Sequence, residues 1–425
     1  MTRTSLPDRR RRTRRVAITG IGAITPIGNG RDGLWAGVVA GRSAVRRVSR
    51  FDPGGFRSQV AAEVDSFDPL DYLEPPRARR LDRYSQFAIA AAQQAVLDSG
   101  LCLSPARTEH TGVYLGSALG GLSFAEEQHT AFLDGGLRAV NNILALTVFG
   151  SAASCNIAME MGLHGPNQTN ANSCASGAVA IGEAFRLIRR GGARIMLAGG
   201  VETPLAPLIF GAFDLIRALS SNCNHNPSLA SRPFDACRDG FVLAEGAAVL
   251  VLEDYEHARA RGATVYAEIL GYATTTDAYH MTAPRPDAAQ TIRAMRQALA
   301  EAHLPPTAID YINAHASSTP LNDRTETYAI KQVFGEHAYR VPISGTKAMH
   351  GHALGASGAI ELAISCLAMQ HDYLPPTINL HNPDPDCDLD YIPNEGRHMH
   401  INTLMSNSFG FGGINACLVL GRPQA

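Results

Sequence analysis

The chain has 425 residues, enough for two average domains or one large doubled domain with a substantial core. A hydrophobic fraction of 45%, 40 glycines and only 18% charged residues exclude a disordered or fibrous protein and indicate a tightly packed globular one. A net charge of −2 provides no general attraction to nucleic acid or to an anionic membrane, so we expect neither as a partner.

An arginine-rich segment, residues 9–15, precedes the first apolar run at residues 16–18. A nucleic-acid-binding arm and a secretory signal are two readings, but the next residues are too rich in glycine and proline for a signal or a membrane span. We therefore expect residues 1–15 to form a basic, poorly ordered tail. No other stretch approaches the ~20 apolar residues of a spanning helix, so we expect a soluble, cytoplasmic protein.

Short apolar runs alternate with helical patterns along the rest of the chain, which predicts an α/β fold with a mixed or parallel sheet. Strands are expected near residues 16–22, 111–121, 194–200, 247–253, 265–272, 309–318 and 416–421. The apolar, alanine-rich segment Ser85–Leu97 predicts a helix between two layers. A strand with a glycine turn opens each half of the chain, so we expect two similar halves that join near residue 260.

Cys174 lies at the start of a predicted helix that Gly191 and Gly192 end. The preceding residues, NANS, favour a turn with a capping residue. The free N–H groups and the dipole at a helix start stabilise a thiolate, which makes Cys174 a candidate nucleophile. A buried, inert cysteine is the alternative. The eight cysteines of the chain lack close pairs such as CxxC, so we expect neither a disulfide framework nor a metal site.

His315, Lys347 and His352 are further candidates, each in a polar or glycine-rich turn at the end of an expected element. Lys347 lies beside an apolar run and needs a partner there, for which Glu361 is the most obvious residue. A satisfied structural histidine and a surface lysine beside surface histidines are the alternatives. One thiol with two imidazoles suits acyl transfer followed by carbanion chemistry.

The last glycine-rich turn places Phe409 and Phe411 before the final strand. Such a turn can direct backbone N–H groups inward as an oxyanion hole. It lacks the Lys-Ser/Thr ending of a phosphate-binding loop, and the segment GSALGG lacks a dinucleotide-binding pattern.

Several longer motifs follow in order: SCASGAVAIGEAFRLI, SRPFDACRDGFVLAEGAAVLVLE, INAHASSTPLND, GTKAMHGHALGASGAIE and SNSFGFGGINA. Together they resemble the β-ketoacyl-acyl-carrier-protein synthases of the type II class, in the thiolase-like superfamily. The resemblance implies a five-layered αβαβα fold of two similar halves, here residues 16–260 and 261–425, in a two-chain assembly. It also implies decarboxylative condensation of malonyl-carrier protein with an enzyme-bound acyl chain, without a cofactor beyond the carrier's phosphopantetheine.

The resemblance implies a role for each matching residue. Cys174 is the acylated nucleophile, His315 and His352 serve decarboxylation and condensation, and Lys347 holds a charge network. The backbone N–H groups of Cys174 and Phe411 form the oxyanion hole, and Phe411 is also a gate. The implied supporting residue is Glu361, and Asp323 and Glu326 are expected from their positions to cap or pair locally. Thr282, Ser317 and Thr319 line the pantetheine channel, and Leu119, Ile143, Leu144 and Phe409 border the acyl tunnel. Arg77, Arg79 and Arg80 lie near the carrier-docking region of the family, with an ordinary solvated basic face as the alternative for each.

One segment departs from the housekeeping fatty-acid enzymes of the family. Those enzymes usually have Ser-Pro-Phe-Phe where this chain has residues 141–144, Asn-Asn-Ile-Leu, beside the acyl tunnel. Losing two aromatic rings should reshape the tunnel, and the segment FRSQVAAE resembles polyketide ketosynthases. We therefore prefer a type II polyketide or polyene ketosynthase, with housekeeping fatty-acid elongation as the alternative.

Two further alternatives are less consistent with the residues present. A thiolase would carry a second catalytic cysteine in the GFGG loop, whereas Cys417 falls in the closing strand. A non-catalytic chain-length factor would not be expected to keep Cys174, His315, Lys347 and His352. The carrier protein and either an identical chain or a chain-length-factor-like homologue are the expected partners.

Overall fold

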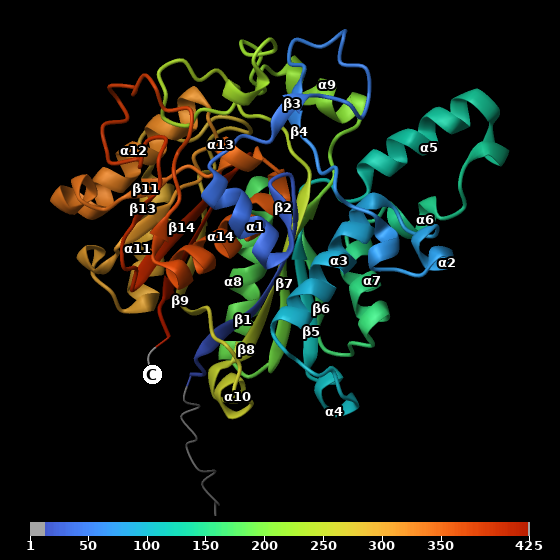
Figure 1. The fold of residues 1–425 in the computed structure, drawn as a ribbon, viewed down its shortest axis with the longest axis horizontal. Coiled ribbons are helices and arrows are strands. Elements are labelled where there is room, and N and C mark those ends of the chain that lie inside the picture. Colours follow the sequence, from blue (N-terminus) through green and yellow to red (C-terminus); the bar gives the residue numbers. More distant parts are fainter. Residues whose placement is uncertain (1–12, 424–425) are drawn as a thin grey trace, which may run out of the picture.

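The computed structural model describes residues 13–423, and its centre is a large mixed sheet (Figure 1). Among the described residues this sheet has 11 strands. In spatial order they are β11 (Ile343–Ser344), β10 (Tyr311–Asn313), β14 (Thr403–Gly410), β15 (Ile414–Gly421), β9 (Ala267–Thr276), β1 (Val16–Thr25), β8 (Gly246–Asp254), β7 (Ile195–Glu202), β5 (Thr111–Gly116) and β6 (Asn167–Asn170), with β2 (Gly28–Asn29) on β1.

The sheet has two limbs that join only through a short pairing of β1 with β9. Three residue pairs make that junction, Val16–Ile18 against Ala267–Ile269. Two helices lie between the limbs: α8 (Ser176–Arg189) contacts β5, β7, β9 and β15, and α14 (Ser357–His371) contacts β8 and β14. The α/β class and the thiolase-like layering expected from the sequence are therefore confirmed.

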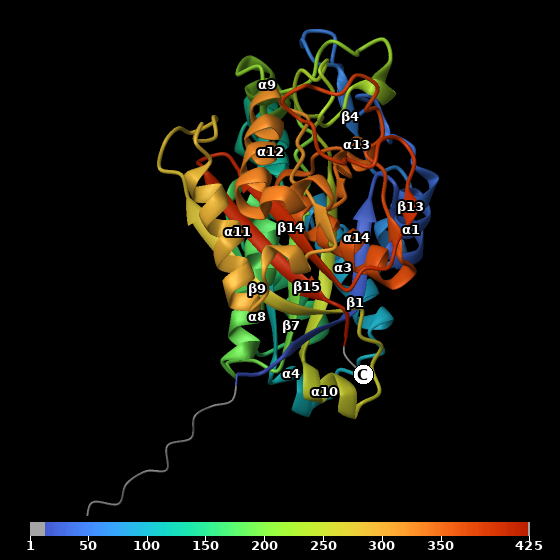
Figure 2. The same ribbon diagram turned by 90° about the vertical axis from the view of Figure 1, so that its left-hand side faces the viewer.

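The outer layers are formed by helices on the far face of each limb (Figures 1 and 2). Helix α3 (Arg83–Asp98) covers β1, β7 and β8, while α11 (Ala289–Ala302) covers β9 and β15. The predicted helix at Ser85–Leu97 is thus confirmed as α3, but its predicted place between two layers is wrong. Its alanine face packs on one limb of the sheet, and the Leu97 side chain on the other face is 83% exposed.

The glycine turn expected with the first strand, within residues 16–22, is also wrong, because β1 continues to Thr25. Gly22 sits directly under α3, where an added Cβ would lie 1.9 Å from the carbonyl oxygen of Ala91. The glycine is required by close packing of a helix on a strand, not by a turn.

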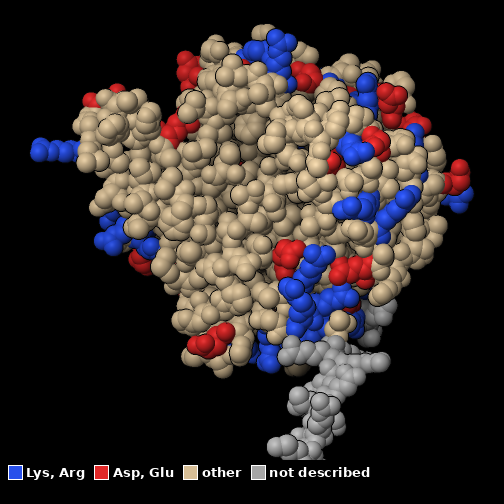
Figure 3. Space-filling view, turned by 180° about the vertical axis from the view of Figure 1, so that it is seen from behind, with Lys and Arg blue, Asp and Glu red and all other residues tan. Residues whose placement is uncertain are grey.

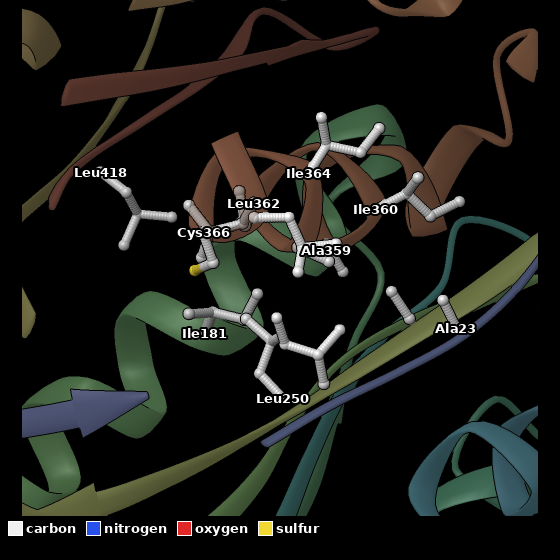
Figure 4. Close-up of a cluster of buried hydrophobic side chains, with 14 of the residues drawn as sticks. Ala23, Ile181, Leu250, Ala359, Ile360, Leu362, Ile364, Cys366 and Leu418 are labelled. Carbon is white, nitrogen blue, oxygen red and sulfur yellow. The ribbon is translucent and has the colours of Figure 1, made fainter. Parts of the chain in front are cut away.

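Separate hydrophobic clusters fill the spaces between layers. The central cluster joins side chains of both middle helices to both limbs, as Figure 4 shows for Ile181 of α8, Ile360 of α14, Leu250 of β8 and Leu418 of β15. Helix α14 is buried from Ser357 to Met369 because protein surrounds it on every side. The middle helices are therefore rigid supports for the residues at their first turns.

The remaining elements complete the outer layers and the loops around them. They are α1 (Gly30–Ala40), α2 (Pro75–Ala78), α4 (Pro105–Thr108), α5 (Leu122–Gly135), α6 (Leu144–Thr147), α7 (Ala152–Met161), α9 (Pro207–Leu215), α10 (Tyr255–Ala260), α12 (Pro320–Phe334), α13 (Lys347–His350), and the two-stranded sheets β3 (Val45–Arg47) with β4 (Val60–Ala62) and β12 (Tyr373–Leu374) with β13 (Arg397–His398). In residues 13–423 no helix is long and apolar enough to cross a membrane.

Most of the predicted basic tail, residues 1–12, lies outside the described residues. Its last two arginines are held on the body of the protein: Arg14 pairs with Asp254 at 3.2 Å, and Arg15 makes two hydrogen bonds of 2.8 and 2.5 Å to Glu268. Figure 3 shows basic side chains gathered where the described chain begins. Arg14 and Arg15 therefore belong to the folded protein and not to a tail.

Candidate active site

Four turns from different parts of the chain meet at one cavity of about 280 Å³. Cys174 lies in a single 3-10 turn (Ser173–Ala175) directly before α8, and His352 lies between α13 and the start of α14. His315 follows β10 and Phe411 follows β14. Each reactive side chain is thus carried by the end of a buried strand or the beginning of a buried helix.

Cys174 is 8% exposed and faces the cavity. Burial raises the pKa of its thiol to about 11, while a hydrogen bond from the backbone N–H of Phe411 and the charge of Lys347 act to lower it. The helix start was expected to favour a thiolate, but the loss of water around the sulfur has the larger effect on the pKa of the thiol. The resting thiol is protonated at neutral pH, and its proton must leave as an acyl group arrives.

His315 and His352 face each other across the cavity. Their ring centroids are 5.3 Å apart and the ring planes are nearly perpendicular, at 79°. Burial, followed by the positive charge of Lys347, lowers both pKa values well below the ordinary 6.5. Both rings are therefore neutral at physiological pH, and each can donate one hydrogen bond without carrying a charge.

Lys347 lies behind His315 and is withdrawn from water. Its Nζ donates to the backbone oxygen of His315 at 2.6 Å and to Oε1 of Glu361 at 2.5 Å. The same Nζ is 3.4 Å from Nδ1 of His315. An ammonium group has only donors, so Nδ1 accepts and the ring proton of His315 lies on Nε2.

The turn that carries His315 has a strained backbone that two buried carboxylates support. Ala316 and Ser318 have φ values of 42° and 67°, in the left-handed region that side chains disfavour. Glu326 accepts hydrogen bonds from the N–H groups of His315 and Ala316, both at 2.9 Å. Asp323 accepts from the backbone N–H of Ser318 within this turn, and it also accepts from the N–H of Phe234 at 3.0 Å and pairs with a buried arginine. These contacts hold the turn in a conformation it would otherwise leave.

The residues expected in the pantetheine channel lie along the cavity wall. Thr282, Ser317 and Thr319 all line it, and the hydroxyl oxygens of Ser317 and Thr319 are 2.9 Å apart. Phe409 also lines the cavity, with its ring 5.8 Å from that of His315. The structure differs from the sequence analysis in placing Phe409 in β14 instead of in a turn.

Other predicted residues lie apart from this cavity. Leu119 packs in the same apolar cluster as Cys174 without lining the cavity. Ile143 and Leu144 are half-buried beside α6 and are also absent from its wall, so within one chain the structure does not bring them to the site. Their place in the acyl tunnel stays a prediction that requires a second chain.

The predicted carrier-docking arginines lie on and just after α2, away from the cavity wall. Arg79 and Arg80 are exposed. Arg77 is engaged within the chain, donating to Asn156 at 2.8 Å and pairing with Glu160 at 3.2 Å. Carrier docking stays a prediction for all three.

Sequence reasoning missed two groups next to the site. Ser357, the first residue of α14, places its hydroxyl 2.8 Å from Nδ1 of His352. Glu202, the last residue of β7, is fully buried among backbone N–H groups near Cys174. The available signal for Glu202 was an acidic residue at the end of a continuous apolar strand, where a charge needs partners.

Comparison with known proteins assigns this arrangement to a family. Residues 13–258 match the family described as "Beta-ketoacyl synthase, N-terminal domain", and residues 266–381 match "Beta-ketoacyl synthase, C-terminal domain". The chain belongs to the β-ketoacyl synthase family.

The chain is similar to relatives named as 3-oxoacyl-[acyl-carrier-protein] synthases and to relatives named as polyketide β-ketoacyl synthases. It is 45% identical to a protein of Synechocystis sp. named 3-oxoacyl-[acyl-carrier-protein] synthase 2, over 97% of this chain and 99% of the relative. It is 43% identical to the granaticin polyketide putative beta-ketoacyl synthase 1 of Streptomyces violaceoruber, with the same coverage.

Solved structures give the same assignment. One is a type II polyketide ketosynthase bound to a hexaketide in complex with its acyl-carrier protein, with a TM-score of 0.89 and 38% identity over 97% of this chain and 100% of that one. Another is the ishigamide ketosynthase/chain length factor, with a TM-score of 0.90 and 36% identity at the same coverage.

Proposed function

We propose that this chain condenses a malonyl unit on an acyl carrier protein with an acyl chain held on Cys174, releasing carbon dioxide and forming a β-ketoacyl-carrier product. One observation carries the proposal: a thiol, two neutral imidazoles and two backbone N–H groups converge on a single cavity. This set provides a nucleophile, two uncharged donors and an oxyanion hole.

The first half-reaction loads the enzyme. The sulfur of Cys174 attacks the acyl-carrier thioester, loses its proton and displaces the carrier thiol, which takes up a proton. The N–H groups of Cys174 and Phe411 stabilise the oxyanion that forms on the acyl carbonyl. Burial of the thiol keeps it unreactive until a substrate carbonyl is in place, because a protonated thiol is a poor nucleophile.

The second half-reaction makes the carbon–carbon bond. Malonyl-carrier enters, and His315 and His352 donate hydrogen bonds to its thioester oxygen. As the carboxylate leaves as carbon dioxide, the electron pair forms an enolate that the two imidazoles stabilise. The enolate carbon then attacks the acyl carbonyl on Cys174, and the thiolate leaves and regains a proton. Neutral donors suit this step because a charged imidazolium would protonate the enolate.

Hydroxyl groups on the cavity wall give the arm of each substrate hydrogen-bonding partners. The hydroxyls of Thr282, Ser317 and Thr319 can bond the amides of phosphopantetheine, and Phe411 can gate entry of the acyl chain. We propose that the carrier's arm is the only prosthetic group in the reaction. Thr319 also caps α12 by accepting from the N–H of Asn322 at 3.3 Å, which fixes its hydroxyl in the channel.

We propose that the enzyme works with a second ketosynthase-like chain, identical or a chain-length-factor homologue. Helices α5 and α6, the segment that joins them and the turn after α6 present large exposed apolar side chains, a surface typical of an interface. These side chains are Leu133, Leu137, Leu146, Val148 and Phe149. Ile143 and Leu144 lie in the same region, so a partner there would close the acyl tunnel over them.

We place the enzyme in type II polyketide or polyene synthesis, with fatty-acid elongation as the alternative. The aliphatic pair at residues 143–144 supports polyketide or polyene synthesis. The relatives include both a 3-oxoacyl-[acyl-carrier-protein] synthase and a polyketide β-ketoacyl synthase, so an experiment is needed to distinguish the two pathways. The chain is co-expressed with each candidate carrier and any neighbouring ketosynthase-like chain, and the products are identified by mass spectrometry. Saturated long-chain fatty products from this chain alone would refute the polyketide assignment.

The reaction itself is tested with Cys174→Ala. Wild type should retain a radiolabelled acyl group from acyl-carrier protein on Cys174 and extend it with malonyl-carrier, whereas the variant should do neither. Cys366→Ala, which removes a buried thiol of the central core, is the matched control and should keep both activities. Undiminished condensation by Cys174→Ala would end this mechanism.

A further inference from the structure

Glu202 is a buried carboxylate that the proposed chemistry does not use. It ends β7, has no exposed surface, and accepts four hydrogen bonds. Oε1 accepts from the hydroxyl of Ser117 and the N–H of Leu119, both at 3.0 Å. Oε2 accepts from the N–H of Ala118 at 2.6 Å and the N–H of Gly355 at 3.0 Å.

This bonding pattern favours the ionised form of the carboxyl group. Three partners are backbone N–H groups, which can only donate, and the fourth is the hydroxyl of Ser117, whose oxygen also accepts from the N–H of Gly120 at 2.9 Å. A carboxylate offers about four acceptor sites, and all are filled only when the group is ionised. Burial raises the pKa of Glu202 to about 7, and the four hydrogen bonds oppose that rise. The geometry therefore favours the charged form.

The four donors come from two turns that are far apart in sequence. Ser117, Ala118 and Leu119 form the turn after β5, and Leu119 and Ala118 pack in the same apolar cluster as Cys174. Gly355 belongs to the turn between His352 and the start of α14. A Cβ at Gly355 would lie 2.5 Å from the N atom of Ala118, so these turns are in direct contact.

We propose that Glu202 is a positioning residue of the condensation. Its carboxylate holds the turn that lies beside the acyl group on Cys174 in a fixed position relative to the turn that carries His352. This inference rests on the proposed condensation activity. The carboxylate acts through both turns. One turn forms the wall against which the acyl thioester lies, and the other carries the imidazole that donates to the malonyl thioester. Reaction between two bound groups depends steeply on such relative placement.

The charge of Glu202 has a second, separable effect on the site. It acts on Cys174 to raise the pKa of the thiol, in the same direction as burial. Removing the negative charge should therefore make the thiol easier to ionise while it makes the enzyme a poorer condensing catalyst. A substitution that merely loosened the fold would also speed the alkylation of buried Cys366, whereas loss of a charge beside Cys174 would leave Cys366 unchanged.

Glu202→Gln provides the test, because it keeps the size of the side chain and places an NH₂ group against donors. We expect kcat for condensation to fall by about ten- to a hundredfold, with KM for acyl-carrier within about threefold of wild type. Alkylation of Cys174 by iodoacetamide, followed by peptide mass spectrometry across pH 7–10, should become faster at each pH. Exposed Cys102 in the same samples is the internal reference.

Glu253→Gln is the matched control. Glu253 is also fully buried and lies on the neighbouring strand β8. It pairs with Ile195 of β7, at the opposite end of the β7–β8 pairing from the pair Glu202–Gly246. Its carboxylate serves Thr19 and Arg261, not the site. This variant should change neither kcat nor the alkylation of Cys174.

If Glu202→Gln does not fold, Ser117→Ala takes its place, because it removes one donor and adds none. A three- to tenfold loss in kcat is then expected. Kcat within twofold of wild type in a folded Glu202→Gln, or in Ser117→Ala if that is the variant tested, would overturn the inference. Slower or unchanged alkylation in Glu202→Gln would also overturn it. If wild type itself does not condense, the proposed function fails, whereas the alkylation result still reports on Glu202.

Discussion

The ammonium of Lys347 and the carboxylate of Glu361 meet at 2.5 Å with side-chain exposures of 1% and 0%. A charge so far from water is tolerated only beside an opposite charge. Removing one partner of such a buried pair lowers the free energy of unfolding by about 3–5 kcal/mol. Because Lys347 also holds the backbone of His315, the pair links the stability of the core to the position of a reacting group.

We therefore expect Glu361→Gln to lower the free energy of unfolding by about 3–5 kcal/mol, measured by chemical denaturation at fixed protein concentration. The control is Glu160→Gln, which breaks the pair with Arg77, whose side chains are 28% and 31% exposed. Pairs of that kind contribute about 0–1 kcal/mol. Equal effects of the two substitutions would contradict the importance of burial here.

The two facing histidines should be separable from a third that lies beside them. His315→Asn and His352→Asn should each slow decarboxylation of malonyl-carrier by about a hundredfold or more, because each removes a donor to the enolate. His350 is as deeply buried but is absent from the cavity wall. His350→Asn should keep the rate within about threefold, as carbon dioxide release would show. A comparable loss in all three variants would argue against specific roles for the pair.

The burial of His350 should also make the stability of the protein depend on pH. Burial, with the charge of Lys347 as a second cause, lowers its pKa from 6.5 to about 3. Between those values the unfolded chain binds a proton that the folded chain does not, so stability present above pH 6.5 is lost as the pH falls. In this range each such group lowers the free energy of unfolding by up to about 1.4 kcal/mol for each pH unit that the pH falls.

His350→Asn removes that proton uptake. Relative to wild type, the variant should gain about 1.2 kcal/mol of stability on moving from pH 6 to pH 5, whatever its stability at pH 7. Denaturant unfolding at pH 7, 6 and 5 measures this difference. A constant difference across the series would show that His350 takes up a proton as readily in the folded state as in the unfolded chain.

The channel hydroxyls should affect substrate binding more than turnover. Ser317→Ala removes a hydroxyl from the cavity wall but keeps the neighbouring Thr319 hydroxyl that caps α12, so KM for carrier-bound substrate should rise about three- to tenfold with kcat within twofold. Thr319→Ala should show a similar rise and also lose about 1 kcal/mol of stability, because Thr319 caps α12. A fall in kcat alone would place these hydroxyls outside substrate binding.

The exposed apolar surface on α5 and α6 should be the contact with a second chain. Leu146→Glu is expected to halve the mass seen by light scattering, because it buries a charge in the interface. Leu97→Glu, at a still more exposed leucine on α3, is the control and should leave the mass unchanged. If wild type alone is already a monomer, the same pair of variants is examined for binding to the neighbouring ketosynthase-like chain.

The sequence by itself determined the fold class and the family, and it predicted side chains that the structure brings to one site. Alternating apolar runs predicted an α/β fold with a mixed or parallel sheet, and Cys174, His315, Lys347 and His352 each stood in a turn at the end of such a run. These are local signals, because strand periodicity, helix starts and turn residues depend on neighbours in the chain.

Only the tertiary structure decided which helices are central, which charges are buried and how the site titrates. Gly22 looked like a turn because the helix packed on it is 69 residues further along the chain at Ala91. Glu202 went unnoticed because three of its four donors come from residues more than 80 positions away and the fourth from Gly355. The thiol of Cys174 was expected to ionise from its place at a helix start, yet burial dominates. Desolvation depends on everything that surrounds a group in space, and no local stretch of sequence contains that information.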